Sequence, residues 1–253
     1  MVDFNTIQAF LRTSVRTWRE CQMVGPFLAS FSRRSPNPYL NYAIPEDGAV
    51  PSDADIRALI GAYRDRGLAP RLEYIPDLAP AVEPALLRAG FSPEGRLALM
   101  DFPHAVGGER PVPSGFELIA PSTDVELLSV RIVQHEAYGA PEPPGPSDIE
   151  SLRHALEASG GAVLAQTAPG AVPAGAGEYS PPFAGVTEIT SVGVRTEYRR
   201  RGLAAAMTDW LIRQTREHDI PHAFLMANAA EARIYARVGF VTHGQVLHIR
   251  THP

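Results

Sequence analysis

Residues 189–206 read ITSVGVRTEYRRRGLAAA, and this stretch decides the expected fold. An apolar, β-branched run from Val186 to Val194 predicts a strand. Three arginines and Gly202 follow, and an amphipathic helix begins with Leu203. Because backbone N–H groups at a helix start lack partners and the helix dipole favours negative charge there, an anion binds well at such a place. The stretch therefore predicts a strand, a basic turn and a helix.

Small residues in the turn suit a phosphate. Gly202 and Ala204 would let a pyrophosphate come close to the backbone. The arginines supply the counter-charge, and one guanidinium can bind two phosphate oxygens in a bidentate way. A solvated basic turn before an ordinary surface helix explains the same residues equally well. Taken without further motifs, the unit indicates a phosphate-containing ligand and no more.

Composition excludes several classes of function. The chain has 253 residues, 23 basic and 28 acidic, with a formal net charge of −5, and every one of the 23 is arginine. Without lysine there is no P-loop and no pyridoxal Schiff base. An acidic chain argues against nucleic acid as the main partner. A single cysteine, Cys21, excludes an internal disulfide, and we expect it to act as a small buried hydrophobe.

We expect a soluble cytoplasmic protein. The first residues carry Asp3 and no long apolar run, so no signal peptide is predicted, and no stretch has the ~18 apolar residues of a membrane span. No metal site is expected either. His218 and His222 have the spacing of helical metal ligands, but Pro221 between them breaks the helix.

Proline and glycine clusters divide the chain into two halves. The segment 103–114 has no apolar periodicity and predicts a linker, and 139–146 separates two helices. The segment 169–182 predicts a loop-rich stretch that joins or interrupts two short strands. Apolar periodicity and caps predict helices at 4–18, 81–89, 124–138, 148–158 (capped by Ser147), 203–211 and 231–237, and a further helix that Ser52 opens and Gly67 ends. Strands are predicted at 71–75, 96–102, 115–120, 162–166, 186–194, 223–226 and 245–249.

The two halves repeat one order of elements. In each half a long helix is followed by a strand led by proline, Pro70 or Pro221, and a short helix ends in Gly-Phe, at Gly90 or Gly239. Any chain of alternating helices and strands has some such likeness, but the shared Gly-Phe offset favours a degenerate duplication. A duplication would make two similar domains from one chain.

Two motifs together resemble a known family. Arg199-x-x-Gly202-x-Ala204 after a Val-Gly-Val strand is similar to the acyl-CoA signature of the GNAT N-acetyltransferase superfamily, and Asn228, Tyr235 and Gly239-Phe240 stand at the spacing of its later motif. The resemblance implies an α/β fold with a mixed central sheet in two tandem GNAT-like domains. These are a degenerate domain at 1–103 without the arginine–glycine loop, a linker at 104–114 and an acetyltransferase domain at 115–253.

The resemblance also implies a site for acetyl-CoA as cosubstrate. The pantetheine arm would pair with the backbone of Val192 and Val194 where two strands splay, and the Val192 N–H would stabilise an oxyanion. Asn228 would bond the cofactor arm, although a simple turn residue is the alternative. The implied cofactor-binding residues are Val192, Gly193, Val194, Arg199, Arg200, Arg201, Gly202, Leu203, Ala204, Asn228 and Tyr235.

Two side chains are the catalytic candidates. Tyr235 resembles the family's general acid for the departing thiolate, and its alternative role is aromatic packing. Glu188 stands where some members have the general base, and its alternative is a solvated carboxylate, with water as the base. Tyr138 and the loop 139–146 are candidates for acceptor specificity, against a plain surface loop.

The implied function is transfer of an acetyl group from acetyl-CoA to an amine of a small molecule or peptide by direct attack. A non-catalytic acyl-CoA-binding sensor is the main alternative, and a nucleic-acid-binding module that uses the arginine loop is a third. We expect no nucleic acid and no membrane as partners. A homodimer stays open, as do the acceptor and the pathway.

Overall fold

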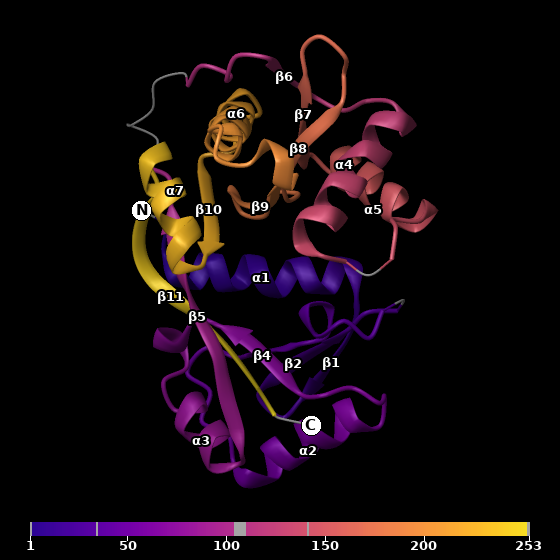
Figure 1. Cartoon of the computed structure of the whole chain (residues 1–253). Coiled ribbons are helices and arrows are strands. Elements are labelled where there is room, and N and C mark those ends of the chain that lie inside the picture. Colours follow the sequence, from indigo (N-terminus) through magenta and orange to yellow (C-terminus); the bar gives the residue numbers. More distant parts are fainter. Residues whose placement is uncertain (1, 34, 104–109, 141, 252–253) are drawn as a thin grey trace. The chain divides into compact units, whose positions relative to one another are not determined.

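The computed structural model describes residues 2–33, 35–103, 110–140 and 142–251 (Figure 1). Contacts divide the chain into two compact units, which we describe one at a time. The C-terminal unit comprises Met100–Leu225 and Ala230–Thr242. The N-terminal unit comprises Val2–Leu99, Met226–Ala229 and the chain from His243 onward.

The N-terminal unit has a mixed sheet, in which β3 pairs parallel with β4, while β1 with β2, β2 with β3 and β4 with β11 pair antiparallel. Its strands lie in the order β1 (Glu20–Val24), β2 (Phe27–Phe31), β3 (Ala43–Pro45), β4 (Arg71–Tyr74), β11 (Val241–Thr251) and β5 (Phe91–Asp101). Its helices are α1 (Phe4–Trp18), α2 (Asp53–Arg64) and α3 (Val82–Arg88), with short 3-10 turns at Pro38–Leu40 and Pro76–Leu78.

The C-terminal unit repeats this plan, because its one recorded parallel pair is β9 with β10 and the other pairs are antiparallel. Its strands lie in the order β10 (His222–Ala227), β9 (Val186–Val194), β8 (Pro173–Tyr179), β7 (Gly161–Thr167) and β6 (Phe116–Ile119). Its helices are α4 (Asp124–Tyr138), α5 (Pro146–Glu157), α6 (Leu203–Glu217) and α7 (Ala229–Val238), with a 3-10 turn at Thr196–Tyr198.

Helices cover both faces of the C-terminal sheet (Figure 1). Ala176 of β8 packs in a core with Leu127, Val130 and Val133 of α4. Its neighbour Gly175 points to the other face, where an added Cβ would lie 2.9 Å from the Met207 Cε atom of α6. The sheet is therefore enclosed between α4 and α5 on one face and α6 on the other.

The expected fold class is confirmed. Both units are α/β with a mixed sheet, and the helices at 4–18 and 124–138 and the strand at 186–194 have the predicted bounds. The capping box of Ser52 and Asp55 is also present, with the Ser52 N–H donating to Asp55 at 2.8 Å. These elements carry strong local signals, so their positions follow from the sequence.

Three local expectations were wrong. The proline- and glycine-rich segment 169–182 is not a loop, because its middle forms the buried strand β8, whose glycines give α6 room to approach. Ser147 does not cap α5: Gly145 is the N-cap, and its N–H donates to Asp148 at 2.7 Å. The hairpin of β1 and β2, together with β3, was not predicted at all, and β2 and β3 are buried along their whole length, so they lack the alternation of a half-buried strand.

The last strand of the chain lies in the N-terminal unit. β11 pairs antiparallel with β4, with Leu247 opposite Tyr74 and Ile249 opposite Leu72. A strand contributed from the far end of the chain thus completes the N-terminal sheet. Residues 104–109 of the predicted linker lie outside the described residues, and the domain boundary there stays a prediction.

The capping box of α4 predicts a stability effect. Thr123 accepts from the Glu126 N–H, and Glu126 accepts from the Thr123 N–H. We expect Thr123→Ala to lower the free energy of unfolding by about 1 kcal/mol, measured by urea denaturation. Ser151→Ala is the control, since that exposed hydroxyl bonds only to a carbonyl of its own helix. Equal unfolding midpoints for the two variants would contradict the assignment.

Candidate functional site

Strand β9 contains a bulge. Glu178 of β8 lies opposite Thr190 and Ala176 lies opposite Gly193, so the two residues between, Ser191 and Val192, share one position across from Gly177. Ser191 has a φ angle of 56°, in the left-handed region. A bulge takes backbone groups out of the regular ladder and redirects them. Groups that would otherwise pair inside the sheet are thereby turned toward another partner.

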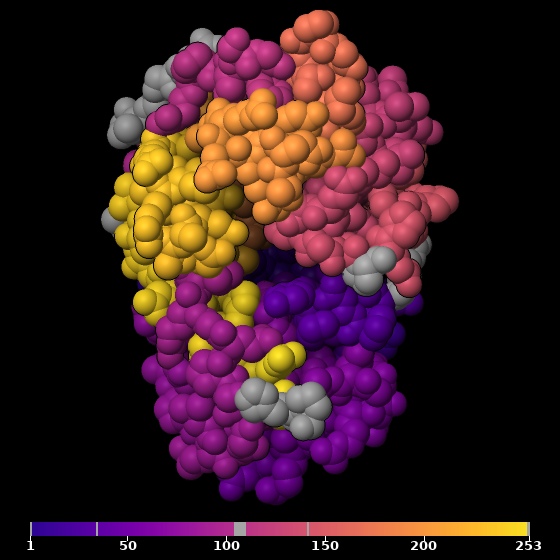
Figure 2. Space-filling model, in the orientation of Figure 1, coloured from indigo at the N-terminus to yellow at the C-terminus, as the bar shows by residue number. Residues whose placement is uncertain are grey.

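Beyond the middle of β9 its pairing with β10 stops. The recorded register joins residues 186–188 to 222–224, and among the described residues no further pair follows, although β9 continues to Val194. On the face in Figure 2 the surface is hollowed between α7 (yellow) and the rose residues around α4 and α5. The strands therefore splay as predicted, with the bulge on the open stretch of β9.

The basic turn leads directly into an uncapped helix. Arg200 and Gly202 both have left-handed φ angles, 61° and 87°. Gly202 is the N-cap of α6, and within the described part of the chain the helix has no side-chain cap hydrogen bond. The N–H groups of this turn are therefore available to an anion, and the glycine is needed because its φ angle strains other residues.

The three arginines of the turn have different surroundings. The Arg199 guanidinium donates to the Val194 carbonyl at 3.0 Å and to the Ala137 carbonyl at 3.4 Å. Arg201 donates to the Glu197 carbonyl and lies near the rings of Phe116 and Tyr198.

Arg200 is exposed, and no hydrogen bond or ion pair of its side chain is recorded among the described residues. Of the three arginines it has the guanidinium best placed to take an anion, while Arg199 joins β9 to the end of α4.

Two phenols lie close together in the C-terminal unit. Tyr235 of α7 is partly buried and packs against Phe240 at 6.1 Å between ring centres. Burial raises the pKa of Tyr235, and the nearby Tyr138 and Glu231 raise it further. A phenol with a raised pKa stays protonated through the neutral range, so Tyr235 can donate a proton.

Tyr138 ends α4 at the bulge. Its hydroxyl donates to the Val192 carbonyl at 3.2 Å, although the residue as a whole is 62% exposed. Desolvation beside the strand raises the pKa of Tyr138 to about 12, and Glu231 and Glu178 add to the effect. This contact brings α4 directly to the backbone of Val192, which sequence reasoning did not foresee.

The other predicted residues have plain positions. Glu188 is partly buried on β9 opposite Phe224, before the strands splay. Leu203 is buried in the first turn of α6, and Ala204 follows it. Asn228 lies between β10 and α7, in the short piece of chain assigned to the N-terminal unit. The catalytic role of Glu188 and the cofactor role of Asn228 stay predictions.

A buried polar network was missed from the sequence. Gln134 and Glu178 are 5% and 9% exposed, and the Gln134 amide donates to Glu178 Oε1 at 2.5 Å. Arg131 donates to the same oxygen at 2.6 Å and to the Gln134 oxygen at 2.8 Å. A polar side chain on the apolar face of a predicted helix was the available signal.

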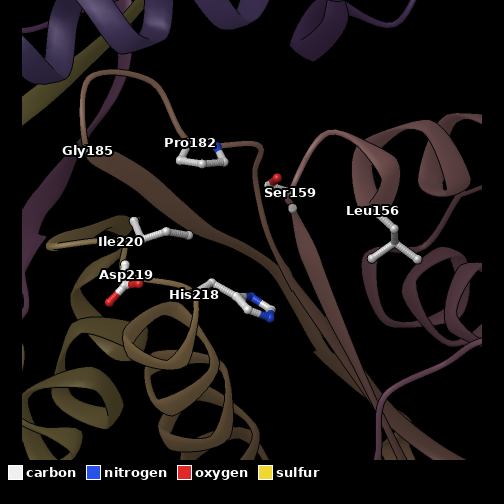
Figure 3. A pocket seen from close by; sticks show the side chains of 8 residues that line it. Leu156, Ser159, Pro182, Gly185, His218, Asp219 and Ile220 are labelled. Carbon is white, nitrogen blue, oxygen red and sulfur yellow. The ribbon is translucent and has the colours of Figure 1, made fainter.

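A separate hollow of about 640 Å³ contains none of the predicted site residues (Figure 3). His218 and Asp219, which follow α6, line it together with Leu156 and Ser159 near the end of α5. The His218 ring is held by the Tyr179 hydroxyl at 2.6 Å. The described residues contain no group of three or more metal-ligating side chains, and no described helix is long and apolar enough to cross a membrane.

Known proteins share this fold. Residues 127–240 match the model of the acetyltransferase (GNAT) family. A GCN5-related N-acetyltransferase from Kribbella flavida superposes with a TM-score of 0.80 at 21% identity, covering 100% of this chain and 97% of the other. A GCN5-related N-acetyltransferase from Sphaerobacter thermophilus gives 0.71 at 15% identity, covering 95% and 84%.

A tandem GNAT protein from the clavulanic acid biosynthesis pathway gives 0.65 at 11% identity, covering 90% and 79%. No curated protein sequence matches the chain significantly. At these identities the structural likeness establishes the fold, and the family match covers the unit that carries the bulge, the basic turn and Tyr235. Residues 127–240 therefore match the model of the GNAT acetyltransferase family, and the whole chain has the fold of a solved GCN5-related N-acetyltransferase.

Proposed function

We propose that the protein transfers an acetyl group from acetyl-CoA to an amine of a small molecule or peptide. The observation that carries this proposal is the bulge at Ser191 and Val192, on the stretch of β9 that no longer pairs with β10. The basic turn that follows β9 leads from this bulge to the start of α6. Donors for a pyrophosphate, an edge for an extended arm and a redirected peptide group follow one another along residues 191–204.

The residues of the C-terminal unit fit acetyl-CoA. The turn from Arg200 to Ala204 offers backbone N–H groups and the exposed guanidinium of Arg200 to the pyrophosphate, and the exposed Arg201 lies beside them. The pantetheine arm pairs with β9 as an added strand. The Val192 carbonyl already accepts from Tyr138, but a carbonyl has two lone pairs and can accept a second donor. The Tyr138 contact therefore leaves the Val192 carbonyl able to accept from the pantetheine arm.

The chemistry proceeds by direct attack. The amine nitrogen bonds to the thioester carbon, and the Val192 N–H stabilises the negative oxygen of the tetrahedral species. The carbon–sulfur bond then breaks, and Tyr235 protonates the departing thiolate. Glu188, directly or through water, takes the proton that the amine loses. Because the two reactants are held side by side, proximity contributes a large part of the rate.

We expect Arg200 to contribute to the affinity for acetyl-CoA. We expect acetyl-CoA to raise the melting temperature of the wild-type protein, since a ligand that binds only the folded state stabilises it. Arg200→Ala should raise the Kd for acetyl-CoA about tenfold, because one charge-assisted phosphate contact is lost. Arg153→Ala, at an exposed ion pair with Asp124 on α4, is the control. No stabilisation of wild type by acetyl-CoA would overturn the proposed function.

The phenol of Tyr235 predicts the rate and its pH dependence. We expect Tyr235→Phe to lower kcat about 100-fold with little change in KM for acetyl-CoA, as for the loss of a general acid. Because the pKa of Tyr235 is raised, wild-type kcat should not fall on the alkaline side before the ordinary tyrosine pKa of about 10 is passed. Thiol release with an amine panel measures both.

Tyr179→Phe is the matched control, since it also removes a buried phenol hydroxyl, one bonded to His218. If both variants lose activity equally, the loss follows from removing a buried hydroxyl and not from proton donation by Tyr235. Binding of acetyl-CoA without thiol release for any amine in the panel would instead indicate an acyl-CoA sensor.

A further inference from the structure

The bulge of β9 is held by side chains of α4. Ser191 and Val192 occupy one position of the ladder, so their carbonyls need partners outside the regular pairing. Gln134 Nε2 donates to the Ser191 carbonyl at 3.3 Å, and the Tyr138 hydroxyl donates to the Val192 carbonyl at 3.2 Å. These two residues are one helical turn apart, on the side of α4 that faces β9.

The Gln134 contact also fixes the direction of the Val192 N–H, because both groups belong to one peptide bond. The Ser191 carbonyl and the Val192 N–H belong to the same peptide group, and in a planar trans peptide they point in opposite directions. When Gln134 holds the carbonyl, the N–H of Val192 must point away from Gln134. Its direction is therefore fixed by a side chain that does not contact the N–H itself.

The orientation of the Gln134 amide is fixed in turn. Its nitrogen faces Glu178 Oε1 at 2.5 Å, and its oxygen accepts from Arg131 NH1 at 2.8 Å. Turning the amide by half a revolution would place its oxygen against the Glu178 carboxylate and its nitrogen against Arg131. The Arg131 guanidinium is itself anchored to Glu178 and to the Asp148 carbonyl of α5, at 2.6 and 3.1 Å.

Close packing prevents α4 from drifting. An added Cβ at Gly193 would lie 2.7 Å from the Ala137 Cβ atom. Any larger residue at position 193 would therefore push α4 away from β9. Arg195 pairs with Glu136 at 2.6 Å and also donates to the Pro173 carbonyl of β8. The donors of α4 therefore meet the bulge from a fixed distance.

We propose that Gln134, oriented by Glu178 and Arg131 and assisted by Tyr138, is a positioning residue that aims the Val192 N–H at the oxyanion of the transfer reaction. This inference rests on the proposed function, because an oxyanion forms only if acyl transfer occurs. Gln134 does not contact the reacting atoms. It acts through the Ser191–Val192 peptide.

Gln134→Met tests this assignment in the full-length protein. Methionine has a similar length and fills the space but lacks the amide donors, and Arg131 still pairs with Glu178. We expect kcat to fall about 10- to 100-fold, less than or equal to the loss of a whole oxyanion donor, with KM for acetyl-CoA nearly unchanged. The control is Gln166→Met, which removes a Gln–Glu hydrogen bond of 2.7 Å between β6 and β7.

A spectroscopic readout separates positioning from simple damage. With acetyl-CoA labelled with ¹³C at the carbonyl, we expect the carbonyl stretch of the bound thioester to lie at higher frequency in Gln134→Met than in wild type, because a misdirected N–H polarises it less. Unchanged frequency together with unchanged kcat would overturn the proposal. So would a loss of activity caused by KM alone.

Two further measurements keep the outcome decisive. Should Gln134→Met fail to fold, Tyr138→Phe at the exposed end of α4 tests the same clamp, by which we mean the hydrogen bonds from Gln134 and Tyr138 to the bulge. We expect a smaller fall in kcat for Tyr138→Phe, and an unchanged kcat would contradict the proposal. Amide hydrogen exchange at Val192 needs no substrate. Faster exchange in Gln134→Met supports the clamp even if wild type transfers no acetyl group, and unchanged exchange overturns it, so failure of the clamp and failure of the proposed function are distinguishable.

Discussion

A left-handed serine in the middle of a β-strand is the constraint on which the C-terminal unit depends. Outside glycine, this conformation costs about 1 kcal/mol or more, and it persists only where the surroundings hold it. At Ser191 the surroundings are the Gln134 amide on one side and the two-to-one pairing with Gly177 on the other. Removing the bulge would return β9 to a regular ladder and leave its open edge without a redirected peptide group.

Small residues permit this arrangement, and charged ones hold it. Gly193 lets α4 approach β9, and Gly175 lets α6 approach β8 from the opposite face. Arg199 then bonds to carbonyls of both β9 and α4, so an arginine of the basic turn also joins the bulged strand to the helix. Within residues 191–204 the backbone conformation and the arginine contacts therefore support one another.

The two units show what remains of a repeat. Each has a mixed sheet with one recorded parallel strand pair, β3 with β4 and β9 with β10. The short helix before the final strand ends in Gly-Phe in both, at Gly90 and Gly239, and both glycines have positive φ angles. A sequence pattern that suggested duplication thus corresponds to a shared plan of folding. The strand pairing adds that β11, from the end of the chain, serves the N-terminal sheet.

The sequence by itself determined the elements whose signals are local. The capped helices, the strand 186–194 and the basic turn at Arg199–Gly202 could be predicted because periodicity, caps and glycine act within a few residues. Even there the three arginines look alike in the sequence, and in the structure all three are exposed, but Arg199 and Arg201 donate to backbone carbonyls.

Only the tertiary structure decided the rest. That 173–179 is a buried strand, that β11 pairs with β4, and that Gln134 and Tyr138 hold the carbonyls of Ser191 and Val192 are contacts between residues far apart in the chain. No local pattern predicts these contacts. In the sequence, glycines that permit close packing look like loop residues, and a buried glutamine such as Gln134 looks like a surface residue. The role of these glycines and of Gln134 depends on the distant residues that pack against them in the folded chain.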